Sequence, residues 1–230
     1  MAEERVLLIT GASSGIGRAT ALQAASKGYR LALAARRIEK LEALVDDIGA
    51  EQALALECDV RDVESQKNMV RRTLERFSRI DAVFANAGRG GEPGGFSSCD
   101  PEIWKSMLMI NVFGVAVTLQ VCLPPLKASK GHVLINGSVA GRRTIAGSMY
   151  GASKWAVKAI GYNLREELRG SGVRVTLIEP GMVDTPFFDD PKPDALRDGD
   201  IANAVLYALS QPPSVDVHEL MVLPTPPSEA

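Results

Sequence analysis

A glycine-rich turn near the N-terminus, set between an apolar run and a helical pattern, most constrains the fold. Val6–Ile9 is apolar throughout and rich in branched residues, as expected of a strand buried on both faces of a parallel sheet. The next segment, Thr10-Gly11-Ala12-Ser13-Ser14-Gly15-Ile16-Gly17, is called the glycine turn below. It leads into a helical pattern over Arg18–Lys27. This strand–turn–helix context predicts a dinucleotide site in an open α/β sheet.

Each glycine of the glycine turn has an expected role. Gly11 permits a tight turn, Gly15 lets the backbone approach a pyrophosphate, and Gly17 lets the helix pack close to the sheet. The helix start then offers N–H groups and a partial positive charge to phosphates, with Ser13, Ser14 and Ile16 among the contacts. A glycine triad alone would be weak support, because it also occurs in ordinary turns.

Strand-like and helix-like segments alternate along the rest of the chain. After Val6–Ile9, we expect strands at Arg30–Ala35, Ala53–Leu56, Asp81–Ala85, His132–Asn136, Val173–Ile178 and Val217–Leu223. After Arg18–Lys27, we expect helices at Glu39–Ile48, Asp62–Phe77, Pro101–Leu123, Tyr150–Arg169 and Asp200–Ser210. The pattern predicts one doubly wound Rossmann-type domain over residues 1–230, with about seven mostly parallel strands and helices on both faces.

Tyr150 and Lys154 lie four residues apart at the start of a predicted helix. That spacing places both side chains on one face, one turn apart. An ammonium beside a phenol favours the phenolate, so we expect Lys154 to lower the pKa of Tyr150 from about 10. A tyrosine of this kind can exchange a proton with an alcohol or carbonyl oxygen, and Ser138 could hydrogen-bond the same oxygen. Taken alone, such a pair is more often an ordinary surface pair.

Two arginines, Arg36 and Arg37, follow the second predicted strand, where NAD-binding sites carry an acidic residue for the ribose. Cations at a helix start are disfavoured unless an anion joins them, and the 2′-phosphate of NADP is such an anion. The alternative is a pair of solvated arginines. We therefore predict that NADP(H) is preferred over NAD(H), selected by Arg36 with support from Arg37 and Ser13.

Thr-Gly-x-x-x-Gly-x-Gly at Thr10–Gly17, followed by Tyr-x-x-x-Lys at Tyr150–Lys154, resembles the short-chain dehydrogenase/reductase family over nearly the whole chain. The resemblance implies Asn111, Ser138, Tyr150 and Lys154 as catalytic residues. It adds cofactor contacts by Asp59, Val60, Asn86, Ala87, Gly88, Pro180, Gly181, Val183 and Thr185, beside Tyr150 and Lys154. It also implies a substrate loop at about 182–199 and a homodimer or homotetramer. Gly137 stands where many relatives have serine.

The expected activity is an NADP(H)-dependent oxidoreductase that transfers hydride between nicotinamide and a carbonyl or secondary alcohol. Tyr150 is the expected proton donor or acceptor. The alternative is a regulatory or sensor protein that binds NADP without turnover, although Asn111, Ser138, Tyr150 and Lys154 are all present. Non-redox chemistry on the same fold is disfavoured by the intact glycine turn. The motifs do not name the substrate.

Composition limits the other classes. The 26 basic and 28 acidic residues give a net charge of −2, so nucleic acid is not an expected partner. Cys58, Cys99 and Cys122 have no metal-ligand spacing, so we expect free thiols, no metal site and a cytoplasmic protein. The apolar N-terminal run is too short for a membrane span. The proline-rich end, about 224–230, is expected to fray.

Overall fold

A computed structural model of the chain describes residues 5–91, 94–188 and 190–226. Seven strands form one sheet in the order β3-β2-β1-β4-β5-β6-β9, and every neighbouring pair is parallel. The strands are β1 (Val6–Thr10), β2 (Arg30–Ala35), β3 (Ala53–Glu57), β4 (Ala82–Ala85), β5 (His132–Asn136), β6 (Arg174–Pro180) and β9 (Glu219–Val222). The predicted seven-stranded doubly wound sheet is confirmed.

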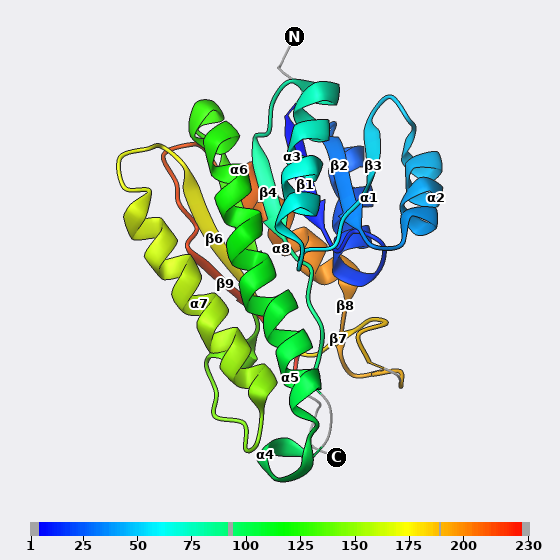
Figure 1. Cartoon of the computed structure of the whole chain (residues 1–230). Coiled ribbons are helices and arrows are strands. Elements are labelled where there is room, and N and C mark those ends of the chain that lie inside the picture. Colours follow the sequence, from blue (N-terminus) through cyan, green and yellow to red (C-terminus); the bar gives the residue numbers. More distant parts are fainter. Residues whose placement is uncertain (1–4, 92–93, 189, 227–230) are drawn as a thin grey trace.

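Helices cover both faces of this sheet (Figure 1). The main ones are α1 (Gly15–Ser26), α2 (Ile38–Ile48), α3 (Val63–Phe77), α5 (Pro101–Leu108), α6 (Val115–Ser129), α7 (Met149–Glu167) and α8 (Asp198–Ser210). Residues alternate along each strand, so Leu8 faces a core shared with α3, α6 and α7. Leu7 and Ile9 face the opposite core, shared with α1, α2 and α8. Both faces are buried, which explains why β1 is apolar throughout.

The strand order reverses between β1 and β4. In open α/β sheets the crevice at the carboxyl ends of two such strands is the usual ligand site. The glycine turn follows β1, and Asn86 follows β4, so both lie at this point. The fold therefore brings the two predicted cofactor segments together.

The predicted helix Pro101–Leu123 is longer than expected and is not a regular α-helix. Between α5 and α6 a π-helix, η1 (Met109–Gly114), widens the turn, and α6 continues through Pro124 and Pro125 to Ser129. Single π-turns inside α-helices often occur at functional sites. The predicted residue Asn111 lies within η1.

The substrate loop expected at about 182–199 contains regular structure that the sequence pattern did not predict. Two short strands, β7 (Val183–Asp184) and β8 (Leu196–Arg197), pair in parallel. Leu196 N also donates to Met182 O at 3.0 Å. Val183 is buried, so the loop base is closed by main-chain bonds around an apolar anchor.

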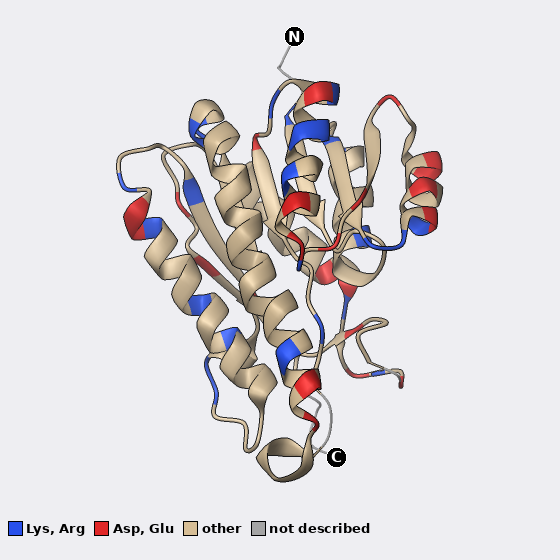
Figure 2. Cartoon of the chain, viewed as in Figure 1, with Lys and Arg blue, Asp and Glu red and all other residues tan. Residues whose placement is uncertain are grey.

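Within the described residues, one helical run, Pro101–Ser129, is long and apolar enough to span a membrane by length and composition alone. Its α6 portion carries very few charged residues (Figure 2). In this fold, however, Val115, Leu119, Cys122 and Leu126 pack into the core beside β4, β5 and β6. That packing accounts for its hydropathy.

Candidate active site

The glycine turn is packed so closely that side chains would not fit at two of its glycines. Gly11 has φ +67°, and a Cβ there would lie 2.9 Å from Ala87 Cα. A Cβ on Gly17 would lie 2.4 Å from the Gly11 carbonyl oxygen. Gly15 has φ +51°, and its Cβ would meet Thr185 at 3.2 Å. The turn therefore lies against the segment after β4 and against the start of the 182–199 loop.

Asn86 ties the two strand ends together. Its Nδ2 donates to Thr10 O at 3.0 Å and its backbone N–H donates to Thr10 Oγ1 at 3.1 Å. Ala87 N donates to the same hydroxyl at 3.2 Å, and Asn136 Nδ2 donates to Asn86 Oδ1 at 2.9 Å. One asparagine thus links the ends of β1, β4 and β5, and Asn136 was not among the predicted site residues.

The start of α1 has the features of an anion site. Ser14 makes no side-chain capping bond, and the first turn of α1 contains no acidic residue. Arg37 Nη2 instead donates to Ser13 Oγ at 3.1 Å and Ser14 Oγ at 3.3 Å. Arg36 lines a shallow pocket further out, beside Asp59 and Arg72. Of the two predicted arginines, Arg37 is the one that contacts the glycine turn.

Asp59 lines this outer pocket and Val60 follows it in the chain, and each of them contacts another part of the protein. Asp59 forms an ion pair with Arg61 at 2.5 Å, and hydrogen bonds from Arg61 hold the pKa of Asp59 below its usual value. Val60 packs against Gly114 of η1, and a Cβ on Gly114 would lie 2.9 Å from Val60 Cγ2. Sequence reasoning gave neither contact.

Ser138, Tyr150 and Lys154 converge at the carboxyl end of β5. Ser138 caps a short 3₁₀ helix, η2 (Val139–Gly141), and accepts from Ala140 N at 3.1 Å. Its hydroxyl is hydrogen-bonded to the half-buried Tyr150 phenol. Lys154, only 7% exposed, donates from Nζ to Asn136 O at 2.9 Å and lies 5.7 Å from the Tyr150 ring centroid.

The expectation that Lys154 lowers the pKa of Tyr150 is wrong for this structure. Burial raises the pKa of Tyr150, and the Ser138 hydrogen bond only partly opposes this effect. Burial also lowers the pKa of Lys154 to about 8. Both shifts have the same cause, since removing water disfavours the charged form of each group. The Lys154 ammonium approaches the face of the tyrosine ring, a cation–π position, and does not bond the phenol oxygen.

Asn111 is buried and fully engaged. Its Oδ1 accepts from Arg89 N at 2.9 Å, and its Nδ2 donates to Arg89 O at 3.0 Å and Ser153 Oγ at 3.1 Å. Ser153 in turn donates to Tyr150 O at 2.7 Å. Asn111 therefore fixes the segment after Gly88 to the first turn of α7. Ser153, which is completely buried, is a supporting residue that the motif gave no signal for.

The open side of Tyr150 is bordered by the loops. Phe187 lies edge-on to the Tyr150 ring, with centroids 5.9 Å apart, and packs on Phe188 at 5.3 Å. A Cβ on Gly91 would lie 3.3 Å from Tyr150 Cβ. The wall beside the Tyr150 ring is therefore apolar, and it is made by Gly91, Phe187 and Phe188.

The motif at the end of β6 is anchored on both sides. Pro180 is the last residue of β6, and Gly181 N donates to Val222 O at 2.7 Å. Val183 is buried and Thr185 reaches Gly15, as described above. These four residues therefore join the glycine turn to the catalytic end of the sheet.

A charged network next to this motif was missed from the sequence. Glu179, 1% exposed, pairs with Arg142, which lies in the loop between Ser138 and Tyr150. Arg142 also pairs with Glu219 on β9, and Lys158 of α7 lies 3.2 Å from Glu219. The network links the catalytic loop to β6, β9 and α7. Among the described residues, no group of three or more His, Cys, Asp or Glu side chains is placed to hold a metal ion.

Comparisons with known proteins agree with this geometry. A family model described as short chain dehydrogenase matches residues 5–195. The uncharacterized oxidoreductase Lmo0432 of Listeria monocytogenes serovar 1/2a is 38% identical over 243 residues, covering 97% of each chain. The sulfoacetaldehyde reductase of Chromohalobacter salexigens is 38% identical over 236 residues, covering 95% of this chain and 93% of that protein.

A solved structure is also similar over nearly its whole length. It is an alcohol dehydrogenase from the archaeon Thermococcus sibiricus, complexed with 5-hydroxy-NADP. The two proteins are 34% identical and superpose with a TM-score of 0.92, covering 99% of this chain and 100% of that one. Family model, relatives and fold all agree, and this chain belongs to the short chain dehydrogenase family.

Proposed function

We propose that this protein is an NADP(H)-dependent oxidoreductase that interconverts a carbonyl compound and its alcohol, with Tyr150 as the proton donor and acceptor. The observation that carries the proposal is the convergence of Ser138, Tyr150 and Lys154 beside the glycine turn. The similar proteins named above include an alcohol dehydrogenase and an aldehyde reductase. Their reactions are of the same class.

The residues present fit a nicotinamide dinucleotide. The start of α1 has no acidic residue or side-chain cap, so its N–H groups and dipole are available to a pyrophosphate. Gly11 and Gly15 have positive φ, which favours glycine, and because glycine has no side chain the backbone there is accessible to phosphates. When bound, the nicotinamide supplies or accepts the hydride. We expect Lys154 to hold the adjoining ribose hydroxyls.

The chain's own residues would handle the proton. At neutral pH the Tyr150 phenol is protonated, because burial raises its pKa, so it can donate to a carbonyl oxygen. Ser138 would donate a second hydrogen bond to that oxygen as negative charge develops. Lys154, with a pKa of about 8, is mostly charged at pH 7 and donates to the Asn136 carbonyl oxygen. Asn111 keeps the neighbouring backbone in place.

The test is the loss of reduced-nicotinamide absorbance with NADPH across a panel of small ketones, aldehydes and diketones. Tyr150→Phe should lower turnover by about 10²–10⁴-fold, because the positioned acid is removed. Binding of NADPH, followed by fluorescence, should persist in that variant. Tyr207→Phe, an exposed tyrosine on α8, is the matched control. Near-wild-type turnover by Tyr150→Phe would refute the proton-transfer role, and tight NADPH binding without turnover of any carbonyl or alcohol would favour a sensor.

The same proposal includes a substrate of modest size with an apolar part. Phe187, Phe188 and Gly91 border the open side of Tyr150, and none of them is charged. An apolar wall of this kind excludes water and favours ketones or aldehydes with small hydrocarbon groups.

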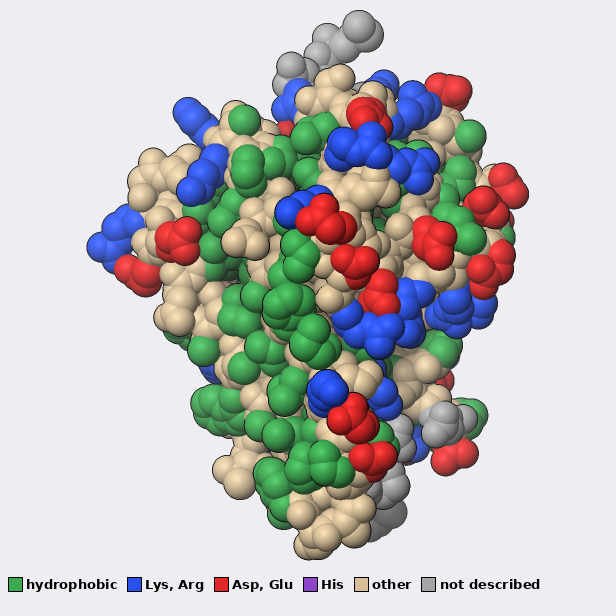
Figure 3. Space-filling view, viewed as in Figure 1, with side chains coloured by type: hydrophobic (Ala, Val, Ile, Leu, Met, Phe, Trp, Pro, Cys, Tyr) green, Lys and Arg blue, Asp and Glu red, His purple; other side chains and the backbone are tan. Residues whose placement is uncertain are grey.

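We further propose that the protein is a homodimer or homotetramer. Hydrophobic side chains gather along α5 and α6 and between α6 and α7 on the face seen in Figure 3. Phe113 is 38% exposed and Trp155 is 51% exposed. Burying such an apolar face is a common reason for self-association. Light scattering of the purified protein should give a mass at least twice the 24.6 kDa of one chain, and a single-chain mass would refute this proposal.

A further inference from the structure

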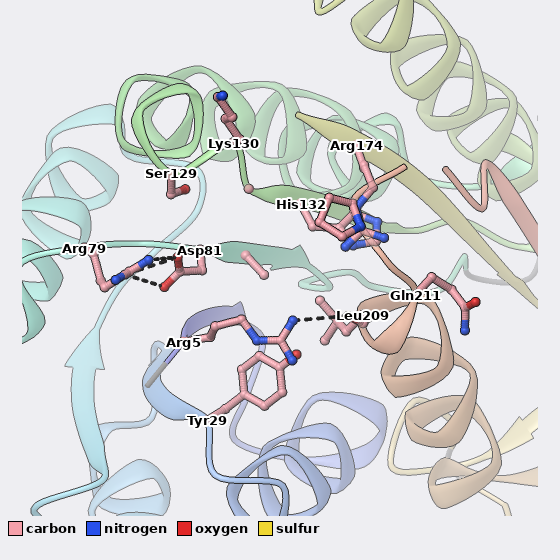
Figure 4. Close-up of a pocket in the computed structure, with 13 residues that line it drawn as sticks. Arg5, Tyr29, Arg79, Asp81, Ser129, Lys130, His132, Arg174, Leu209 and Gln211 are labelled. Atoms are coloured by element: carbon pink, nitrogen blue, oxygen red, sulfur yellow. Dashed lines mark hydrogen bonds and ion pairs between the residues drawn. The ribbon is translucent and has the colours of Figure 1, made fainter. Parts of the chain in front are cut away.

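A cavity lies at the amino ends of the strands, on the edge of the sheet opposite the glycine turn (Figure 4). Its volume is about 330 Å³, and its walls include Arg5 before β1, Tyr29 before β2, His132 at the start of β5 and Arg174 at the start of β6. The end of α8, at Leu209, closes one side. None of these residues belongs to the candidate active site.

The charge lining this cavity is mostly positive. Four basic residues, Arg5, Arg79, Lys130 and Arg174, face a single acidic residue, Asp81. Asp81 is already engaged by Arg79, with the closest N–O distance 2.7 Å, and by Val6 N at 2.8 Å. Lys130 points its ammonium away from the other side chains in Figure 4. The excess positive charge inside the cavity therefore comes from Arg5 and Arg174.

These two guanidinium groups are held in place by contacts that use only part of their N–H donors. Arg5 stacks on the Tyr29 ring at 4.7 Å and donates from Nη1 to Leu209 O at 3.4 Å. Arg174 donates from Nη1 to Ala208 O at 3.3 Å and Val215 O at 3.1 Å. An arginine has five N–H donors, and within the described residues each of these two guanidinium groups donates from Nη1 alone.

The rings of His132 and Tyr29, which also line the cavity, are neutral and polar. His132 Nε2 lies 2.7 Å from Thr176 Oγ1, whose own proton goes to Val217 O, so Nε2 is the donor and Nδ1 carries the lone pair. Burial and the two arginines lower the pKa of His132 to about 3. Burial raises the pKa of Tyr29, so its phenol remains a hydrogen-bond donor. The site's charge is therefore permanent and does not depend on a titrating group near neutral pH.

We propose that this cavity binds a small phosphomonoester, with the guanidinium groups of Arg5 and Arg174 and the Tyr29 phenol holding its phosphate. One guanidinium group comes from the residue before β1 and the other from the start of β6. Two such planar groups suit a tetrahedral dianion better than a carboxylate, which a single arginine satisfies. The volume exceeds what a bare oxyanion needs, and the Leu209 and Tyr29 walls leave apolar room for a small organic group. The competing explanation is that both arginines only satisfy the last carbonyls of α8.

Isothermal titration of the whole chain with inorganic phosphate and with glycerol phosphate, at constant ionic strength, tests the proposal. Saturable binding is expected for both, and Arg5→Gln should raise the dissociation constant about tenfold or more, as loss of a charged hydrogen bond does. Arg174→Lys, which keeps the charge but lacks the fork, should also weaken binding. Arg71→Gln, which removes an exposed arginine of α3 that pairs with Glu75, is the matched control and should bind as wild type.

A further variant shows at which of the two sites phosphate binds. Arg37→Gln would weaken phosphate bound at the glycine turn and leave phosphate at the amino-end cavity unaffected. Arg5 is exposed, so Arg5→Gln is expected to fold normally, with the circular dichroism spectrum of the wild type. No saturable binding at millimolar phosphate would overturn the proposal. Binding that is unchanged in both Arg5→Gln and Arg174→Lys would overturn it as well.

Discussion

At the scale of single residues, burial decides the chemistry of the candidate site more than sequence spacing does. Tyr150 and Lys154 are four apart, as a shared helix face requires, yet the ammonium bonds the Asn136 carbonyl and not the phenol. Burial moves the pKa of Tyr150 up and that of Lys154 down. The residue types follow from the sequence, and their protonation follows from the surroundings.

Arg36 and Arg37 carry the prediction for cofactor choice. We expect Arg37→Ala to lower the NADPH-to-NADH ratio of kcat/KM by about tenfold or more, because its guanidinium lies on Ser13 and Ser14 beside α1. Arg36→Ala should lower the ratio as well, since Arg36 lines the adjoining pocket. Steady-state rates with both cofactors measure this effect. Arg169→Ala, which removes an exposed arginine outside that pocket, separates a general loss of positive charge from a specific one. An unchanged ratio in both Arg36→Ala and Arg37→Ala would contradict NADP selection.

At the scale of elements, the catalytic loop is tied to the sheet by charge. Arg142 lies in the loop from β5 to α7 and pairs with Glu179 at the end of β6. Glu179 immediately precedes Pro180 and Gly181, so one buried carboxylate couples the two segments that flank the proposed nicotinamide site. The π-helix η1 acts similarly, because it places Asn111 between the segment after β4 and α7.

Glu179→Gln should destabilise the fold by on the order of 3 kcal/mol, because the partly buried Arg142 loses the more deeply buried of its two carboxylate partners. Urea unfolding followed by circular dichroism measures this change. Glu64→Gln removes an exposed carboxylate that pairs with Lys67 and should cost less than about 0.5 kcal/mol. Equal effects of the two substitutions would show that the buried network does not stabilise the loop.

At the scale of the whole molecule, the two edges of the sheet have different chemistry. The carboxyl edge holds the glycine turn and the catalytic residues, and the amino edge holds the basic cavity with Arg5 and Arg174. His132, 2% exposed, lies at the start of a central strand beside that cavity. Its position makes the stability of the sheet sensitive to acid.

The pKa of His132 is about 3 in the folded protein and about 6.5 when unfolded. The unfolded chain therefore binds the extra proton first, so this contribution to stability is complete above pH 6.5 and is lost as the pH falls toward 3. The loss is up to about 1.4 kcal/mol for each pH unit. The urea midpoints of unfolding at pH 7 and pH 5 should differ less in His132→Gln than in the wild type. An equal difference between the two midpoints in both proteins would contradict the role of His132 in acid sensitivity.

Local features of the sequence determined the architecture. The apolar run Val6–Ile9, the glycine spacing of 11, 15 and 17, and the alternation of strand and helix periods predicted the seven parallel strands and the place of the cofactor segments. These features act within a few residues, because hydrophobic period and positive φ are properties of the local chain. Even so, the 182–199 loop and the helix around Asn111 departed from the local pattern.

The tertiary structure alone decided how distant polar groups pair. The Lys154–Asn136, Asn111–Arg89 and Arg142–Glu179 contacts join residues 18, 22 and 37 positions apart. The convergence of Arg5 and Arg174 also requires the strand order, since β1 and β6 are not neighbours in the sheet. A sequence pattern gives the period of each element, but which side chains meet, and how much water they lose, depends on how the elements pack. For that reason the motif predicted the residues of the site, and only the fold determined their hydrogen bonds and pKa shifts.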